Sequence, residues 1–185
     1  MSHESGVSNM NDFLPADYNV PEKGGSYMKF QPGENRFRIL ASPILGYLYW
    51  TEDNTGKRTP NRIRMNERMS ADLVLGQDDE VKHFWAMPVW NYKEEQVQIL
   101  EITQKGLMKS IRALTADPDW GSPLAYDLAV TKTGAMKETK YSLSPKPAKP
   151  LDEGISQLYQ DMHINLEALY DGEDPFAEAS DVISK

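Results

Sequence analysis

Residues 81–102, VKHFWAMPVWNYKEEQVQILEI, decide the predicted fold class. The first part, residues 81–92, is rich in aromatic and aliphatic side chains, which is typical of a strand. Residues 93–95 are a charged turn, and residues 96–102 are a second apolar run short enough for a strand. Thr103 then caps a helix whose apolar face is formed by Leu107, Ile111 and Leu114. The stretch therefore predicts two strands followed by a helix.

Strand patterns also occur on both sides of this stretch. Upstream, residues 35–51 predict the first strand, which Pro43 interrupts. Downstream, residues 126–131 and 139–143 predict a fourth and a fifth strand, with a turn at Gly134 between them. Three strands, a helix and two strands is the order of the OB-fold, a five-stranded Greek-key barrel that binds oligonucleotides. We therefore predict a mainly β fold of this type, with one helix between strands 3 and 4.

The chain is predicted to have three parts. Residues 1–25 are polar and interrupted by proline and glycine, and they indicate a flexible N-terminal arm. Residues 26–147 form the predicted OB-fold domain, in which residues 52–80 have no clear period and predict a long loop or insertion that closes over a bound strand. Residues 148–185 predict a linker, a helix over residues 152–170 and an acidic tail. The helix either packs on the barrel or mediates self-association.

Charge is distributed unevenly along the chain, whose formal net charge is -8. Residues 26–150 carry 18 Lys and Arg against 15 Asp and Glu, whereas residues 151–185 carry one Lys against nine acids. A mildly basic body with an acidic tail is typical of proteins that bind polyanions, because the tail can shield the basic surface or recruit partners. A tail that is simply solvated is the alternative. Residues 172–185 contain few apolar side chains, so we expect that their removal tightens DNA binding without unfolding the protein.

Several classes of protein are excluded by what the chain lacks. It has no cysteine, no phosphate-binding loop and no motif of a hydrolase or metalloprotease, so we expect no enzyme. The three histidines are scattered, and the carboxylates at residues 78–80 indicate a solvated loop, so no metal or cofactor is expected. The longest apolar run, residues 44–50, is too short for a membrane helix, and the N-terminus has no signal-peptide pattern. We therefore expect a soluble, cytoplasmic protein with no membrane partner.

Aromatic and basic side chains interleave on the predicted strands and in the 52–80 loop. Single-stranded nucleic acid needs this combination, because bases stack on aromatic faces for about 1–3 kcal/mol each while Lys and Arg follow the phosphates. Strand side chains alternate, so about half of the aromatic residues should instead point into the core. Arg36 and Arg38 lie opposite Phe37 and are expected to point into a groove or into solvent. The candidate DNA-binding residues are Arg36, Arg38, Tyr47, Tyr49, Trp50, Lys57, Arg58, Arg62, Arg64, Lys82, Trp85, Trp90, Tyr92, Lys132, Lys137 and Lys140.

One segment carries a family resemblance. Residues 120–134 (WGSPLAYDLAVTKTG), together with residues 33–40 (GENRFRIL), 100–105 (LEITQK) and 140–142 (KYS), resemble the bacteriophage single-stranded DNA-binding proteins of OB-fold type, relatives of the helix-destabilising proteins of tailed phages. The resemblance covers about residues 27–147. It implies sequence-tolerant binding and protection of single-stranded DNA during DNA replication, recombination and repair, in the host cytoplasm.

The resemblance also bears on zinc and on partners. The best-known members of that family hold a structural zinc through Cys and His, and this chain has no Cys, so a zinc site is not carried over. Residues 171–185 are similar in composition to the acidic tails that recruit replication enzymes, which implies replication or recombination proteins as partners. Two alternatives remain open: a protein-interaction or structural OB-fold module, and an RNA-binding OB module. Stacking and phosphate contacts do not read the 2′-hydroxyl, so the sequence does not separate DNA from RNA.

Overall fold

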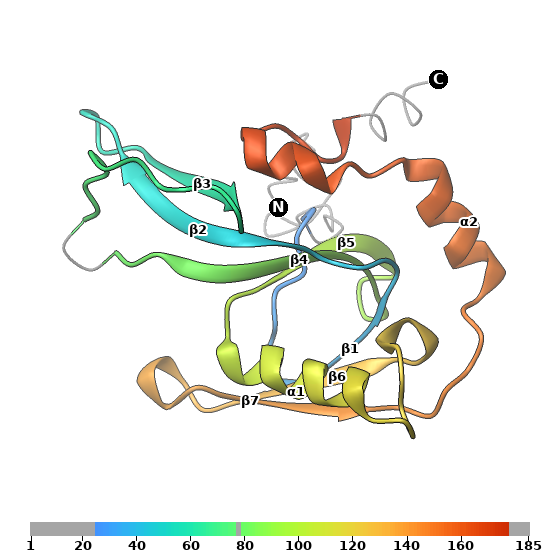
Figure 1. Ribbon diagram of the computed structural model, residues 1–185. Coiled ribbons are helices and arrows are strands. Elements are labelled where there is room, and N and C mark those ends of the chain that lie inside the picture. Colours follow the sequence, from blue (N-terminus) through green and yellow to red (C-terminus); the bar gives the residue numbers. More distant parts are fainter. Residues whose placement is uncertain (1–24, 77–78, 178–185) are drawn as a thin grey trace, which may run out of the picture.

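The computed structural model describes residues 25–76 and 79–177 and consists mainly of β-strands (Figure 1). Most of the predicted arm and the end of the predicted tail lie outside the described residues. The elements, in chain order, are β1 (Gly33–Ile39), β2 (Ile44–Glu52), β3 (Arg58–Arg64), β4 (Lys82–Asn91), β5 (Gln96–Ile102), α1 (Lys105–Ala116), η2 (Pro123–Ala125), β6 (Leu128–Thr133), η3 (Met136–Glu138), β7 (Lys140–Pro145), α2 (Glu153–Met162) and η4 (Leu166–Asp171), where η denotes a 3-10 helix.

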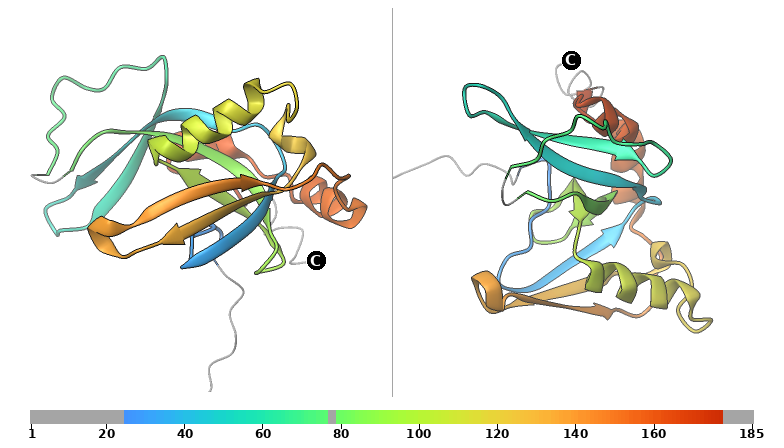
Figure 2. Two further views of the ribbon diagram at one scale, coloured as in Figure 1. Left: turned by 90° about the horizontal axis from the view of Figure 1, so that it is seen from below. Right: turned by 60° about the vertical axis from the view of Figure 1, so that its left-hand side comes forward.

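The seven strands form one open antiparallel sheet in the order β3-β2-β4-β1-β6-β7, and β5 pairs with the other edge of β4. β4 changes partner along its length: residues 82–86 pair with β2, and residues 89–91 pair with β1. The sheet therefore curls around β4, and α1 packs against β7 at its open side (Figures 1 and 2). The predicted mainly β fold is confirmed, and so is the position of a helix between the third and fourth predicted strands.

The predicted loop over residues 52–80 is wrong for its middle part, because residues 58–64 form β3. This strand pairs with β2 from Glu52↔Arg58 to Gly46↔Arg64. Asp53 closes the turn between them, since its Oδ1 accepts hydrogen bonds from the Thr55 and Lys57 amides at 2.8 and 3.0 Å. The sequence of this strand, RTPNRIR, has no alternation of apolar and polar residues and contains a proline, so its pattern does not predict a strand. A proline is tolerated here because β3 is an edge strand.

The helix predicted over residues 152–170 is interrupted. Asp152 caps α2 by accepting hydrogen bonds from the Gly154 and Ile155 amides, and His163 ends it in a left-handed conformation with φ 48°. α2 has no buried residue, whereas η4 buries Ala168 and Leu169. The part of this segment that packs on the sheet is thus the 3-10 helix and not α2. No helix among residues 25–76 and 79–177 is long and apolar enough to cross a membrane.

The core has two parts, one on each face of the curled sheet. The inner cluster is built around Phe37, Met87, Leu100 and Leu128, with side chains of α1 packed into it. The outer cluster consists of Leu48, Phe84, Ala86, Ile99 and Leu169, so the C-terminal segment covers the outer face of β2, β4 and β5. Burial on both faces explains why β4 is apolar without interruption from Phe84 to Trp90 rather than strictly alternating.

The expectation that residues 172–185 contribute nothing to packing is wrong for Pro175 and Phe176. Pro175 is buried, Phe176 packs against the outer cluster, and the Asn165 amide donates a hydrogen bond of 2.9 Å to the Pro175 carbonyl. Burial of part of one phenylalanine is worth roughly 1–2 kcal/mol. A chain truncated after Asp171 is therefore expected to melt a few degrees below a chain truncated after Ala177. Thermal unfolding of the two truncations measures this difference, and equal melting temperatures would contradict the packing of Phe176.

Candidate nucleic-acid interface

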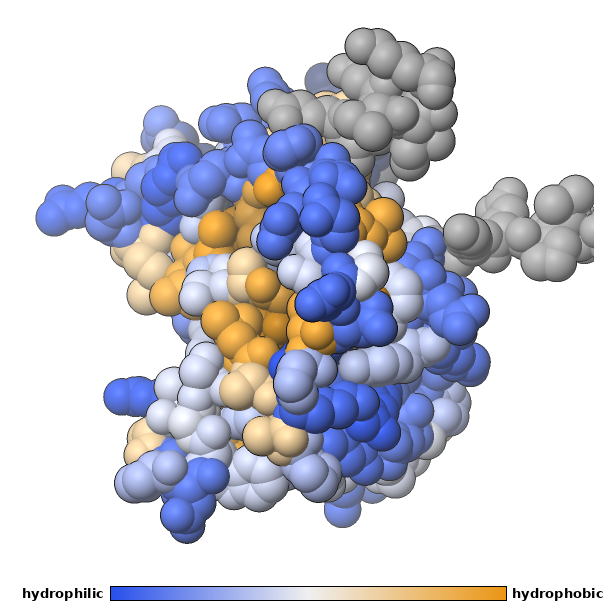
Figure 3. Space-filling model, turned by 90° about the vertical axis from the view of Figure 1, so that its right-hand side faces the viewer, coloured by the Kyte–Doolittle hydropathy of each residue, from blue (hydrophilic) through white to orange (hydrophobic). Residues whose placement is uncertain are grey.

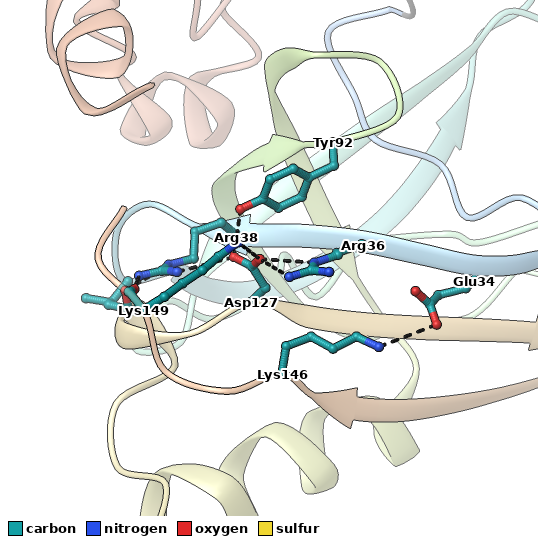
Figure 4. A network of polar contacts seen from close by, with 8 residues as sticks. Glu34, Arg36, Arg38, Tyr92, Asp127, Lys146 and Lys149 are labelled. Carbon is teal, nitrogen blue, oxygen red and sulfur yellow. Dashed lines mark hydrogen bonds and ion pairs between the residues drawn. The ribbon is translucent and has the colours of Figure 1, made fainter. Parts of the chain in front are cut away.

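One buried carboxylate, Asp127, forms ion pairs with cationic side chains that we expected at the surface (Figure 4). Its side chain is fully buried, and its Oδ2 accepts hydrogen bonds from Arg36 Nε and Nη2 at 3.0 and 2.8 Å. Its Oδ1 accepts hydrogen bonds from Arg38 Nη1 at 3.2 Å and from the Tyr92 hydroxyl at 2.8 Å. Lys149 Nζ lies 3.4 Å from Oδ2. We refer to these five residues as the Asp127 cluster.

The protonation states in the Asp127 cluster follow from its geometry. Burial alone would raise the pKa of Asp127, but the hydrogen bonds from Tyr92, Arg36 and Arg38 and the charge of Lys149 outweigh burial, and the pKa is lowered. Burial and the hydrogen bond to Asp127 raise the pKa of Tyr92 to about 12. At neutral pH the carboxylate is therefore ionised and the tyrosine keeps the proton that it donates.

The Asp127 cluster corrects the expected orientation of Arg38. Arg38 is only 2% exposed, so it points neither into a groove nor into solvent. Its guanidinium also donates to the carbonyls of Leu124 and Lys149, at 3.1 and 2.8 Å, and thereby ties β1 to the linker that follows β7. Arg36 is more accessible, with 39% of its side chain exposed, and its guanidinium carbon lies 5.4 Å from the centre of the Tyr92 ring. Both arginines are engaged within the fold.

The three predicted arginines of β3 are also paired with carboxylates. They are separated by even numbers of residues along β3, so their side chains lie on the same face of the strand, the one that contacts η4. Arg62 is the most enclosed of them, with 11% of its side chain exposed, and Arg64 lies 4.4 Å from the ring centre of Tyr170. The pairs are Arg58–Asp79 at 2.6 Å, Arg62–Glu101 at 2.7 Å, and Arg64 with Glu67 at 3.0 Å and with Glu167 at 3.1 Å.

The predicted lysines behave differently from the arginines. Within the part of the chain that the structure describes, no ion pair involves Lys57, Lys82, Lys132, Lys137 or Lys140. Lys57 lies at the β2–β3 turn, Lys82 begins β4, and the other three lie on the β6–β7 hairpin. Both hairpin turns project from the same side of the molecule, which we term the hairpin side (Figures 1 and 2). This side therefore carries cations that have no carboxylate partner among the described residues.

Aromatic side chains occupy both faces of β2 near the hairpin side. Trp50 is 39% exposed, lies on the outer face and has the Arg58 guanidinium carbon 5.7 Å from its ring centre. It lines an open groove of about 410 Å³ together with Arg58 and Lys82 and with the carboxylates of Asp79, Glu80 and Glu101. Tyr47 and Tyr49 lie on the opposite face and are half-buried. Trp50, Lys57 and Lys82 are thus brought to one end of the β2–β3–β4 sheet.

The inner face of β2 and β4 holds an ordered aromatic group. The Tyr47 and His83 rings are 5.7 Å apart, and Trp85 Nε1 donates to His83 Nε2 at 3.2 Å. His83 Nε2 therefore accepts, and Nδ1 donates to the Gly46 carbonyl at 2.8 Å. On the same face Trp85 and Leu45 line an apolar groove of about 350 Å³ whose far wall includes Ile111 of α1. Trp85 is thus largely a core and groove residue.

Trp90 lies beside Arg38 on the sheet but makes no contact in the Asp127 cluster. It pairs with Arg38 on one side and Val97 on the other, on the outer face of β4, and is half-buried. The sixteen predicted residues therefore separate into those in the Asp127 cluster, those paired on β3, those at the hairpin side or on the aromatic faces of β2 and β4, and Trp90.

Asp127 and Lys149 are the members of the Asp127 cluster that the sequence analysis did not single out as candidates. Asp127 stands between Tyr126 and Leu128, both of which are fully buried. A charged residue flanked by two large apolar residues in a predicted strand is a signal of a buried ion pair, because a lone buried charge is too costly. The signal indicates that a cation lies nearby but not which one.

Among residues 25–76 and 79–177, no group of three His, Asp or Glu is placed to hold a metal ion. Comparison of the chain with protein-family models, with curated proteins and with solved structures finds no match.

Proposed function

We propose that this protein binds and protects single-stranded DNA, without sequence preference, on the hairpin side of an open OB-fold. Such a protein acts wherever single strands are exposed, in DNA replication, recombination and repair. The observation that carries the proposal is a set of five lysines on the hairpin side that have no carboxylate partner among the described residues, of which Lys82 lines the same groove as the exposed ring of Trp50. Phosphates bind to such lysines without breaking an ion pair, and bases stack on an exposed indole.

The strand pairing supports the OB-fold part of the proposal. If β1 and β2 are taken as one bent strand, the pairs are first with second, second with third, first with fourth, and fourth with fifth. These are Greek-key neighbours in an OB-fold, whose ligand contacts strands 2 and 3 and loops 1–2 and 4–5. Strands 2 and 3 correspond to β4 and β5, whose outer face is partly covered by η4, so we propose that the DNA lies at the loop end of these strands. In this chain the corresponding loops are the β2–β3 hairpin region and the β6–β7 turn, which border the hairpin side.

Fluorescence titration with oligo-dT tests the proposed site. Trp50 and Trp120 make a matched pair, because they are 39% and 37% exposed but only Trp50 lies at the hairpin side. We expect oligo-dT to quench the fluorescence of the wild-type protein and of Trp120→Phe, and Trp50→Phe to lose most of the quenching. Binding should weaken with salt, at about 0.7 in log K per unit of log salt for each phosphate neutralised.

The controls and the opposing outcomes are defined by the same titration. Titration with oligo-rU measures the preference for DNA over RNA, and titration with duplex DNA measures the preference for single over double strands. Tighter binding of oligo-rU would favour the RNA-binding alternative. Absence of quenching, with a flat response to salt, would contradict nucleic-acid binding altogether.

A protein-interaction module is the second candidate, and one observation favours it. On the side opposite the hairpins, apolar surface gathers in the middle of a polar rim (Figure 3). Leu158 of α2 is 44% exposed, and α2 buries no residue, so the apolar face of this helix is left uncovered. The exposed acids Asp171, Glu173 and Asp174 likewise support recruitment of replication or recombination proteins by the C-terminal segment. Concentration-dependent sedimentation of the purified protein without DNA tests self-association through such a surface.

A further inference from the structure

The tip of the β6–β7 hairpin presents one apolar side chain to solvent. Met136 is 95% exposed and Val74 is 85% exposed, whereas Leu45, Trp50, Met65 and Leu158 are exposed by 39–49%. Met136 lies in the short 3-10 helix η3, between the turn at Gly134 and the start of β7. A hydrophobic side chain left this open contributes no burial to the folded protein, so its whole surface is available for apolar contacts with a ligand.

The backbone holds Met136 outward in a fixed conformation. Met136 itself has φ 49°, in the left-handed region that non-glycine residues rarely adopt. Gly134 has φ 75°, and a Cβ atom there would lie 2.2 Å from the Glu138 carbonyl oxygen, so the turn requires glycine. The Glu138 and Thr139 amides close the tip by donating to the Ala135 and Met136 carbonyls at 3.0 and 3.3 Å. The tip is therefore a defined projection.

The charges around the tip indicate what kind of ligand it meets. Lys137 and Lys140 are exposed, Lys132 is half-buried on the same hairpin, and none of the three has an ion pair in the described part of the chain. Glu138 is the one carboxylate between residues 128 and 145. An exposed apolar side chain next to Lys137, on a hairpin that also carries Lys132 and Lys140, matches a nucleic acid, in which stacked bases lie between rows of phosphates.

We propose that Met136 is a wedge that inserts between adjacent bases and separates them where a single strand meets a duplex. This inference rests on the proposed function and adds a strand-separating role for one residue. Methionine suits the role because its unbranched, polarisable side chain adapts to irregular apolar gaps and contacts ring edges favourably. Apolar side chains, Met included, partly unstack base steps in this way. The lysines of the hairpin hold the backbone while the wedge enters.

The test uses a short duplex with a single-stranded dT tail and 2-aminopurine at the junction, whose fluorescence rises when the base unstacks. Met136→Ala is expected to bind oligo-dT within about twofold of wild type but to open the junction at least about fivefold more slowly, the factor for losing part of the burial of one side chain. Met136→Phe, which keeps an apolar wedge, should retain opening. Leu158→Ala removes an exposed apolar side chain on the opposite side and should match wild type.

The outcomes distinguish failure of the inference from failure of the proposed function. Equal junction opening by Met136→Ala and wild type would overturn the wedge, provided that wild type binds oligo-dT. A parallel loss of oligo-dT affinity and opening in Met136→Ala would also overturn it, because Met136 would then contribute to binding in general. Failure of the wild-type protein to bind oligo-dT would overturn the proposed function and the wedge together. Circular dichroism of each variant confirms folding, which a 95% exposed side chain should not affect.

Discussion

Asp127→Asn is expected to lower the free energy of unfolding by about 3–5 kcal/mol, the range for breaking a buried ion pair from one side. The substitution leaves Arg38, whose side chain is 3% exposed, buried without its counter-charge. It also removes the partner shared by Arg36 and Lys149. The substitution should also weaken the attachment of the linker after β7, because the Arg38 guanidinium donates a hydrogen bond to the Lys149 carbonyl in that linker. In thermal unfolding the variant should melt roughly 10 °C lower.

Glu34→Gln is the matched control for Asp127→Asn. Glu34 pairs with Lys146 at 3.6 Å, and 55% of its side chain is exposed. Solvent-exposed pairs contribute about 0–1 kcal/mol, so the control should melt within a few degrees of wild type. An Asp127→Asn protein as stable as Glu34→Gln would show that the Asp127 cluster contributes little to folding.

The stabilisation of the fold by Asp127 should be lost at acidic pH. The pKa of Asp127 is lower in the folded protein than in the unfolded chain, so its contribution is fully present above the unfolded value of about 3.9. The contribution disappears as the pH falls through the lower, folded pKa. The difference in melting temperature between wild type and Asp127→Asn should therefore be constant from neutral pH to about pH 5 and shrink below about pH 4.

Replacement of both exposed lysines of the β6–β7 hairpin, Lys137→Gln with Lys140→Gln, is expected to weaken oligo-dT binding about tenfold at low salt. Each phosphate contact contributes about 0.7 to the salt dependence of log K, so loss of two contacts should reduce the slope by about 1.4. Neither side chain has an ion pair among the described residues, so the melting temperature should not change. Titrations at several salt concentrations give both the affinity and the slope.

The control for this double variant carries the same change in charge elsewhere. Lys29 and Lys93 are exposed and line a groove beside the β4–β5 turn, away from the hairpin side. Lys29→Gln with Lys93→Gln should reduce affinity only slightly, because charges more than about 10 Å from the DNA are largely screened at 0.1 M salt. An equal loss of oligo-dT affinity in the two double variants would mean that binding depends only on the net charge of the protein and that the hairpin side is not the interface.

Local pattern was enough to predict most of the elements. Residues 81–92 and 96–102 contain apolar runs of strand length separated by a charged turn, and they form β4 and β5. The helix after them was predicted to begin at Thr103, and it begins at Lys105. In contrast, β3 has no apolar alternation, since its arginines are neutralised by partners from other elements. A strand stabilised mainly by its neighbours leaves little pattern in its own sequence.

The candidate site was predicted less well, because sequence gives the type of a charged residue but not its partner. Arg36 and Arg38 were grouped with Lys137 and Lys140, since all four are cations near predicted strands. Arg36 meets Asp127 across 91 residues of chain, and Arg64 meets Glu167 across 103. No local pattern records such pairs.

The sequence by itself determined the elements with a strong local signal: the mainly β fold, the helix between the third and fourth predicted strands, and the turn at Gly134 that shapes the β6–β7 tip. These depend on side-chain periodicity and on the backbone freedom of glycine, which act within a few residues. Only the tertiary structure decided which cations are free. Folding brings Asp127 beside Arg36 and Arg38 and leaves Lys57, Lys82 and the hairpin lysines without a carboxylate in the described chain, because ion pairing depends on distance in space and not on separation in sequence.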